Sequence, residues 1–276
     1  MRHSPTRTIT LAVLTTLIMT SASTAQQPHG LARQALDDST LDWIGRSAPN
    51  LRVFFLRGSY AAEHQDSLVQ RVVSAREQDL QLLGETRFDS TQYVFFLQDR
   101  PQMLRITGMR ATGLAERATG AIFLVTNPDW RAFERHEMMH VLAYQLWGVP
   151  AEPSAWLQEG FAQFADGACG GYPIDPVVTG LAGDGGFFSI DTLMARFRQL
   201  NDLSAYLQAA SFVGYLYRAY GRDVVRATWQ RGLESSAAAL NHTPADLQRA
   251  WIQSLPRPSG VPSADELAVI RKKGCG

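Results

Sequence analysis

Two histidines spaced one helical turn apart place the strongest constraint on how this chain can fold. His136 and His140 enclose the segment His-Glu-Met-Met-His, which lies in a run expected to be helical. Residues four apart on a helix share one face, with about 5–6 Å between their Cβ atoms, so both imidazoles can reach a single ion. The alternative is a pair of buried, hydrogen-bonded histidines in the core face of an amphipathic helix.

Glu159 is the expected third ligand of such an ion. The first helix continues about 10 Å beyond His140, and after a turn a second helix returns about 8 Å to Glu159. The 18 intervening residues, 141–158, suit two helices with a short connection. Two imidazoles and one carboxylate leave a fourth tetrahedral position open, which is typical of catalytic zinc. We therefore expect one Zn²⁺ per chain.

Glu137 and Asp166 are the acidic residues expected to assist these ligands. Glu137 lies between the two histidines, where a carboxylate can reach a water on the metal and act as general base. Asp166 follows Glu159 by seven residues, two turns along the same face. It is expected to accept the outer N–H of a ligand histidine. The alternative for Asp166 is an ordinary exposed carboxylate at a helix end.

These motifs resemble the gluzincins, a group of zinc metallopeptidases in the MA clan. The resemblance rests on the segment 136–140, its spacing to Glu159 and the sequence Trp-Leu-Gln-Glu-Gly-Phe-Ala at 156–162. It is nearest to bacterial exported peptidases of that clan and extends over residues 93–255. It implies a zincin-like α+β fold, with a small N-terminal α/β lobe containing a mixed sheet, a mainly helical C-terminal lobe, and the active site in the cleft between them.

The resemblance also implies how a substrate would be held. A tyrosine on a downstream helix is expected to donate to the oxyanion, and Tyr206 is the first choice over Tyr215, Tyr217 and Tyr220, which core packing also explains. A strand ending near Val125 is expected to be an edge strand that pairs with an extended peptide, unless its apolar side chains simply bury it. The Gly-x-Met-Glu-Asn segment with which aminopeptidase relatives recognise a free amino terminus has no match upstream of the histidines.

The hydrophobic pattern predicts an α/β first half and a mainly helical second half. Runs rich in Val, Phe and Tyr between turn residues indicate strands, and apolar residues at helical spacing indicate helices. The Gly-rich stretch 167–186 is predicted to be a loop, and the tail beyond Pro256 to be irregular. The predicted strands are 51–56, 92–97 and 121–125, and the predicted helices are 61–83, 127–147, 154–166, 190–200, 202–220, 222–233 and 244–255.

The N-terminus indicates export. Arg2 and Arg7 precede an apolar run at 9–19, and Ser-Thr-Ala forms a small-residue cleavage site before Gln26. This run is too short to span the roughly 30 Å of a bilayer core, so we expect a periplasmic or secreted protein with no stable membrane anchor. The expected division is a signal peptide at 1–25, an α/β lobe at 26–126, a helical lobe carrying the zinc site at 127–255, and a tail at 256–276.

Charge and cysteine content narrow the possible partners. The formal net charge is +0 and the arginines are scattered, which disfavours nucleic acid as a partner. Cys169 and Cys275 are the only cysteines, and the sequence leaves open whether they form a disulfide or stay as free thiols.

The expected function is hydrolysis of peptide bonds in a peptide or protein substrate by an exported zinc enzyme. Two alternatives stay open at this point. The chain could be a catalytically silent binding or assembly protein on a peptidase scaffold, or a zinc hydrolase of a non-peptide amide or ester. The sequence does not specify the substrate, the choice between endo- and exopeptidase action, or the oligomeric state.

Overall fold

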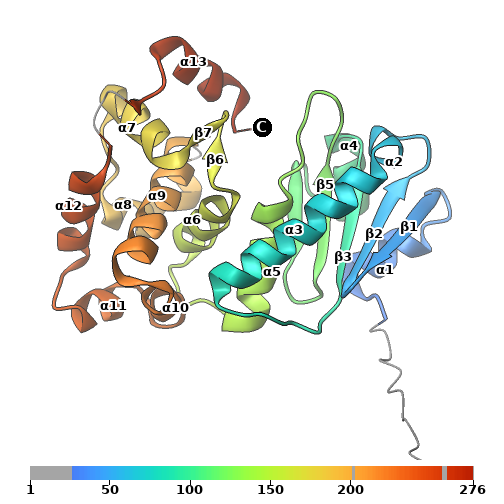
Figure 1. Cartoon of the computed structure of the whole chain (residues 1–276), viewed down its shortest axis with the longest axis horizontal. Coiled ribbons are helices and arrows are strands. Elements are labelled where there is room, and N and C mark those ends of the chain that lie inside the picture. The colour runs from blue at the N-terminus through green and yellow to red at the C-terminus, as the bar shows by residue number, and fades with distance from the viewer. Residues whose placement is uncertain (1–26, 201–202, 257–259, 276) are drawn as a thin grey trace, which may run out of the picture.

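The computed structural model describes residues 27–200, 203–256 and 260–275, and it has an α+β architecture (Figure 1). An α/β/α part precedes a helical part, and the helices α5 and α6 lie where the two meet. The predicted signal peptide at 1–25 lies outside the described residues. Within the described ranges, no helix combines the length and the apolar character that crossing a bilayer requires.

A mixed sheet of five strands, in the order β1-β2-β3-β5-β4, forms the centre of the first part. β2, β3 and β5 are parallel, whereas β1 and β4 pair antiparallel at the two edges. β3 and β5 are buried along their whole length, which explains their unbroken apolar sequences and confirms the three predicted strands. The strands are β1 (Trp43–Ala48), β2 (Leu51–Leu56), β3 (Gln92–Leu97), β4 (Gly113–Glu116) and β5 (Ala121–Val125).

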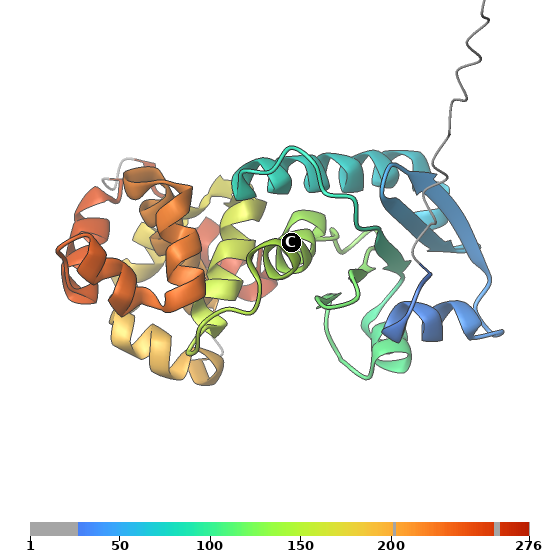
Figure 2. The same cartoon turned by 90° about the horizontal axis from the view of Figure 1, so that it is seen from below.

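Helices cover both faces of this sheet (Figure 2). Alternate side chains of each strand point to opposite faces, so Phe96 and Leu124 pack with α3 and α5, while Phe95 and Phe123 pack with α1 and α4. This alternation of side chains along each strand thus forms two separate apolar clusters, one on each face of the sheet. The helices of this part are α1 (Gly30–Asp37), α2 (Tyr60–Glu63), α3 (Gln65–Leu83) and α4 (Arg100–Thr107).

The helical part shares one apolar cluster with the sheet. That cluster runs from the inner strand face through α5 and α6 to α9. Trp147 stacks on Phe161 at 5.1 Å between ring centroids and joins α5 to α6. The elements are α5 (Glu134–Trp147), α6 (Ala155–Asp166), β6 (Ala168–Cys169), β7 (Tyr172–Pro173), α7 (Ile174–Gly185), α8 (Ile190–Leu200), α9 (Leu203–Tyr220), α10 (Arg222–Arg231), α11 (Leu233–Ala239), α12 (Pro244–Ser254) and α13 (Ala264–Lys273).

The predicted start of the helix at 127–147 is wrong, because α5 begins at Glu134. The backbone of Asn127 exchanges two hydrogen bonds of 3.1 Å with Trp130. Its side-chain oxygen accepts from the Asp129 N–H at 2.9 Å. Asn127 therefore closes a turn after β5, since short polar side chains that bond to nearby backbone compete with helix formation.

The loop predicted at 167–186 and the irregular tail predicted beyond Pro256 are also wrong. The first contains the β6-β7 hairpin and α7, and the second contains α13. A Cβ on Gly180 of α7 would lie 2.7 Å from side-chain atoms of both Leu267 and Val261. The glycines that resembled loop punctuation thus let the C-terminal segment pack closely on α7.

Several smaller boundaries differ from the sequence prediction. The helix predicted at 61–83 is divided at His64 into α2 and α3. The helix predicted at 222–233 ends at Arg231, and α11 follows after Gly232. Gly232 separates the two helices because its φ of 85° lies outside the range of a right-handed helix. The sequence prediction did not include α1, α4, β1 or β4. The helices corresponding to α6, α8, α9 and α12 are confirmed within a few residues at their ends.

Gly160→Ala should lower the free energy of unfolding by about 1–3 kcal/mol, the range for overpacking a dense contact. A Cβ at this position of α6 would lie 2.8 Å from the backbone carbonyl of Ala209 in α9, where nothing flexible can yield. The control is Gly183→Ala in α7, whose Cβ would meet no atom within 4 Å. Urea unfolding should show the control unchanged or slightly stabilised; equal losses in both variants would contradict this packing constraint.

Candidate metal centre

The short connection between α5 and α6 sets the position of the candidate ligands. α5 ends at Gly148, and α6 begins after Ser154. Glu152 shapes the turn, since its carboxylate accepts from the N–H of Ser154 at 2.9 Å and from its hydroxyl at 2.7 Å. The Ser154 hydroxyl in turn accepts from Gln158 at 2.8 Å. The residue directly before Glu159 is thereby fixed to the turn.

His136, His140 and Glu159 converge on one point. The two Nε2 atoms are 3.2 Å apart. Glu159 Oε2 lies 3.4 Å from the Nε2 of each histidine. The side chains are 13%, 7% and 20% exposed, respectively, so the cluster is nearly closed to solvent yet reachable. The three sequence-predicted ligands are thus brought together.

The spacing of these three atoms fits a tetrahedral zinc ion. Ligand atoms placed tetrahedrally at about 2.0–2.1 Å from zinc are about 3.3 Å from one another. Each of the three measured separations, 3.2, 3.4 and 3.4 Å, is within 0.2 Å of that figure. Without an ion, the two imidazole nitrogens would direct lone pairs at each other unless one carried a proton. Neutral imidazoles and a carboxylate are also the donor types that suit zinc.

The cluster favours an ionised Glu159. Burial alone would raise the pKa of Glu159, but hydrogen bonds from His136 and His140 hold that pKa well below its usual value. Burial raises the pKa of Glu137 above its usual value, against the lowering effect of the two imidazoles. The two glutamates thus differ in proton affinity although they share one site. Such a division suits one carboxylate that ligates and one that exchanges a proton.

Glu137 lies against Gly113 at the sheet edge, a contact that the sequence did not predict. A Cβ on Gly113 of β4 would lie 2.2 Å from Glu137 Oε1. Any larger residue at position 113 would therefore force the Glu137 side chain to move. The missed signal was a single glycine in a mixed polar and apolar segment, which has many explanations until the sheet is assembled.

The predicted edge strand was the wrong strand. β5, which ends at Val125, is paired with β3 on one side and β4 on the other, so it has no free edge. β4 is the outermost strand, and it lies beside α5. Its backbone is therefore the one available to an extended peptide near the ligands.

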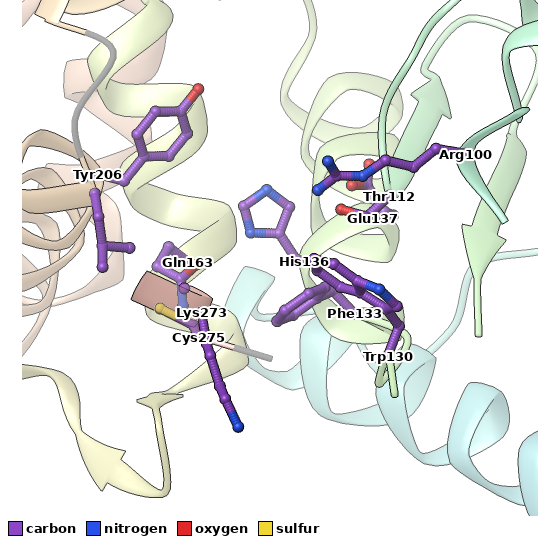
Figure 3. Close-up of a pocket in the computed structure, with 12 residues that line it drawn as sticks. Arg100, Thr112, Trp130, Phe133, His136, Glu137, Gln163, Tyr206, Lys273 and Cys275 are labelled. Carbon is purple, nitrogen blue, oxygen red and sulfur yellow. The ribbon is translucent and has the colours of Figure 1, made fainter. Parts of the chain in front are cut away.

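A cavity of about 300 Å³ opens in front of His136 and Glu137 (Figure 3). Tyr206 lies on the other side of His136 from Glu137 and is 37% exposed. Burial, together with the charges of Glu159 and Glu137, raises the pKa of Tyr206, so its hydroxyl keeps the proton that a donor needs. The cavity is lined by Arg100, Thr112, Trp130, Phe133, His136, Glu137, Gln163, Leu203, Tyr206, Lys273, Gly274 and Cys275.

A disulfide brings the C-terminus to this cavity. Cys169, in β6 shortly after α6, is bonded to Cys275, which settles the pairing that the sequence left open. The bond joins residues 106 positions apart and places Lys273 and Gly274 in the cavity wall. The C-terminal segment is therefore part of the site.

Asp166 lies near the site but is bound to another partner. Both of its oxygens accept from Arg131, at 2.9 and 3.1 Å. Among the described residues, no hydrogen bond joins Asp166 to His136 or His140. Its negative charge still helps to raise the pKa of His136, so the carboxylate acts on this imidazole through space.

A partly buried hydrogen bond joins α5 to α3 directly before His136. Arg135 donates to Asp79 Oδ1 at 3.1 Å, and Asp79 is fully buried. The second oxygen, Oδ2, has no hydrogen-bond partner. Burial raises the pKa of Asp79 to about 8, although Arg135 opposes that rise. The pair positions the first turn of α5 but leaves one buried oxygen unsatisfied.

Comparison with known proteins adds no assignment: no family model matches this chain, and no curated protein matches it.

Zinc content should depend on Glu159 and be insensitive to the charge of Asp166. We expect about one zinc per purified wild-type chain and its loss in Glu159→Ala, since two imidazoles alone leave the tetrahedral set incomplete. Asp166→Asn should keep the metal, because this carboxylate binds Arg131. Elemental analysis of the wild type and of each variant after dialysis measures the zinc content. A wild-type chain that neither contains nor rebinds zinc would refute the assignment of the centre.

The free energy of unfolding should decrease as the pH rises from 5 to 8, because of the raised pKa of Asp79. In this window the folded state keeps the Asp79 proton, with its pKa of about 8, whereas the unfolded state, with a pKa near 3.8, has released it. The folded state then binds more protons, so its stability decreases as pH rises. Asp79→Asn should remove that slope. Urea unfolding of both proteins across the window tests this, and parallel profiles would show an ionised Asp79 throughout.

Proposed function

We propose that this chain is an exported zinc metallopeptidase of the gluzincin type with a zincin-like fold. The observation that carries the proposal is the triangle of His136 Nε2, His140 Nε2 and Glu159 Oε2, whose sides match tetrahedral zinc. Glu137 beside it and a free strand edge in front of it complete the set of parts that peptide hydrolysis needs. The Cys169–Cys275 disulfide supports a location outside the reducing cytoplasm.

Zinc, when bound, would lower the pKa of its water to near neutral pH. It would also polarise the carbonyl group of the peptide bond that is attacked. Glu137 accepts the proton of the attacking water at its carboxylate and returns it to the leaving amine nitrogen. The raised pKa of Glu137 suits both transfers, because general catalysis works best when the pKa lies near the working pH. The missing side chain at Gly113 leaves this carboxylate its place beside β4.

Tyr206 and β4 have separate roles in the proposal. The Tyr206 hydroxyl donates to the oxygen that becomes negative during attack, and its raised pKa keeps it protonated. The outer edge of β4 pairs with the backbone of an extended peptide, so affinity comes from main-chain hydrogen bonds. Glu116 at the end of β4 does not offer a site for a substrate amino terminus. It accepts from the Leu31 N–H and from Thr119 instead.

Glu137→Gln should abolish turnover without loss of zinc. The amide keeps the shape of the side chain but cannot take a proton, and losing a general base lowers rates about 10²–10⁴-fold. Cleavage of labelled denatured casein and of a degenerate quenched-peptide library measures turnover, and elemental analysis measures zinc. The matched control is Glu234→Gln, an exposed residue of α11 outside the cavity, which should behave as wild type.

The outcomes separate three kinds of protein. A zinc-loaded wild type that cleaves peptides and a silent Glu137→Gln support the peptidase. A zinc-loaded wild type that cleaves no peptide but hydrolyses a simple ester or a non-peptide amide through Glu137 indicates another zinc hydrolase. Zinc without any hydrolysis indicates a binding protein and contradicts the proposal.

A further inference from the structure

Three segments that are separated in the sequence meet beside the candidate metal centre. Arg100 is the first residue of α4, which follows β3, while Trp130 follows β5 and Thr112 immediately precedes β4. The carboxyl ends of β3 and β5 are in register, and hydrogen bonds from Val125 N to Thr112 O at 2.8 Å and from Thr126 N to Leu97 O at 2.9 Å join the segments. Arg100, Thr112 and Trp130 all line the cavity that contains His136 and Glu137.

The Arg100 guanidinium is fixed by an aromatic ring and not by a carboxylate. Its central carbon lies 4.8 Å from the centroid of the Trp130 ring. A cation over a ring face is held in place while the N–H groups at its rim stay free to donate. In the described part of the chain, Arg100 takes part in no ion pair and no hydrogen bond.

Three other arginines close to α5 differ from Arg100, because each has a carboxylate partner. Arg71, Arg131 and Arg135, on the far side of α5, are each paired with a buried carboxylate. Their partners are Glu134, Asp166 and Asp79. By contrast, neither Arg100 nor Lys273, the lysine and arginine that line the cavity, forms an ion pair within the described part of the chain.

The cavity as a whole favours an anionic group away from the metal. Its charged lining residues are Arg100, Glu137 and Lys273, with Lys273 on the opposite wall (Figure 3). Glu137 lies at the ligands, where it has a role in the proposed reaction. Trp130 and Phe133 supply apolar surface in the same cavity, while Arg100 itself stays exposed and so reachable by a ligand.

We propose that Arg100, stacked on Trp130, binds a carboxylate of the substrate and so selects which peptides are cleaved. This inference rests on the proposed peptidase function and deepens it. The guanidinium presents a planar pair of N–H donors that matches a carboxylate in bidentate fashion. The carboxylate is either the C-terminal group of the peptide or an Asp or Glu side chain near the scissile bond. Arg100 is a binding residue, so it acts on substrate affinity and leaves the chemical step unaltered.

Matched peptides test the proposal and identify the source of the carboxylate. One quenched fluorescent peptide is made with a free C-terminus and with an amidated one. In a second set, with the amide terminus, single Asp or Glu residues on either side of the scissile bond are compared with Asn or Gln. Wild type should prefer one carboxylate over its amide by about tenfold to a hundredfold in kcat/KM, as charged hydrogen bonds do.

Variants then assign that preference to Arg100. Arg100→Gln should lose the preference through a rise in KM for the acidic peptide, while the amide peptide is cleaved at the wild-type rate. Arg100→Lys should restore part of it, because the charge returns without the bidentate fork. Arg231→Gln, the same charge change at the exposed end of α10 and outside the cavity, should keep the full preference. An unchanged preference in Arg100→Gln would overturn the proposal, as would a wild type without any preference.

A binding measurement separates failure of this inference from failure of the proposed function. Zinc-loaded Glu137→Gln protein is titrated calorimetrically with each acid and amide peptide pair, so no turnover is needed. Tighter binding of the acid, lost when Arg100→Gln is added, supports the carboxylate site even if no peptide is ever cleaved. Equal binding of acid and amide refutes the site even if peptides are cleaved.

Discussion

The packing of α6 between α5 and α9 is the constraint on which the rest of the site depends. Glu159 has to come within 3.4 Å of two nitrogens on another helix, which leaves little room for a shift of α6. Two contacts set its position. The Trp147 and Phe161 rings hold α6 to α5, and Gly160 lets the α6 backbone come close to the Ala209 carbonyl of α9. The polar centre therefore takes its precision from an apolar core, as close-packed interiors allow.

The distribution of charge around α5 gives its two sides different properties. On the side toward α3 and α6, arginines and buried carboxylates are paired and help to fix the first turn of the helix. On the cavity side, Arg100 rests on the ring of Trp130, and its side chain forms no ion pair with any described residue. Compensated charge thus orders the scaffold, and uncompensated charge is left where a ligand can meet it.

The sheet contributes to the site through its edge and through the ends of its strands. β4 approaches Glu137 because Gly113 has no side chain, and the segments after β3 and β5 supply Arg100 and Trp130. The C-terminal segment closes the other wall through the disulfide of Cys275. Residues from the middle and the end of the described chain thus surround a site whose candidate ligands come from two neighbouring helices.

The sequence by itself determined what depends on local periodicity. The buried strands β2, β3 and β5, most helices and the convergence of His136, His140 and Glu159 followed from helical spacing and a short connection. Only the tertiary structure decided the rest. Asn127 formed a turn, the Gly-rich stretch packed as α7, Asp166 paired with Arg131, and β4 took the sheet edge. Apart from the turn at Asn127, which forms through bonds to residues close by, these outcomes depend on contacts between distant segments, which no local pattern of residues encodes.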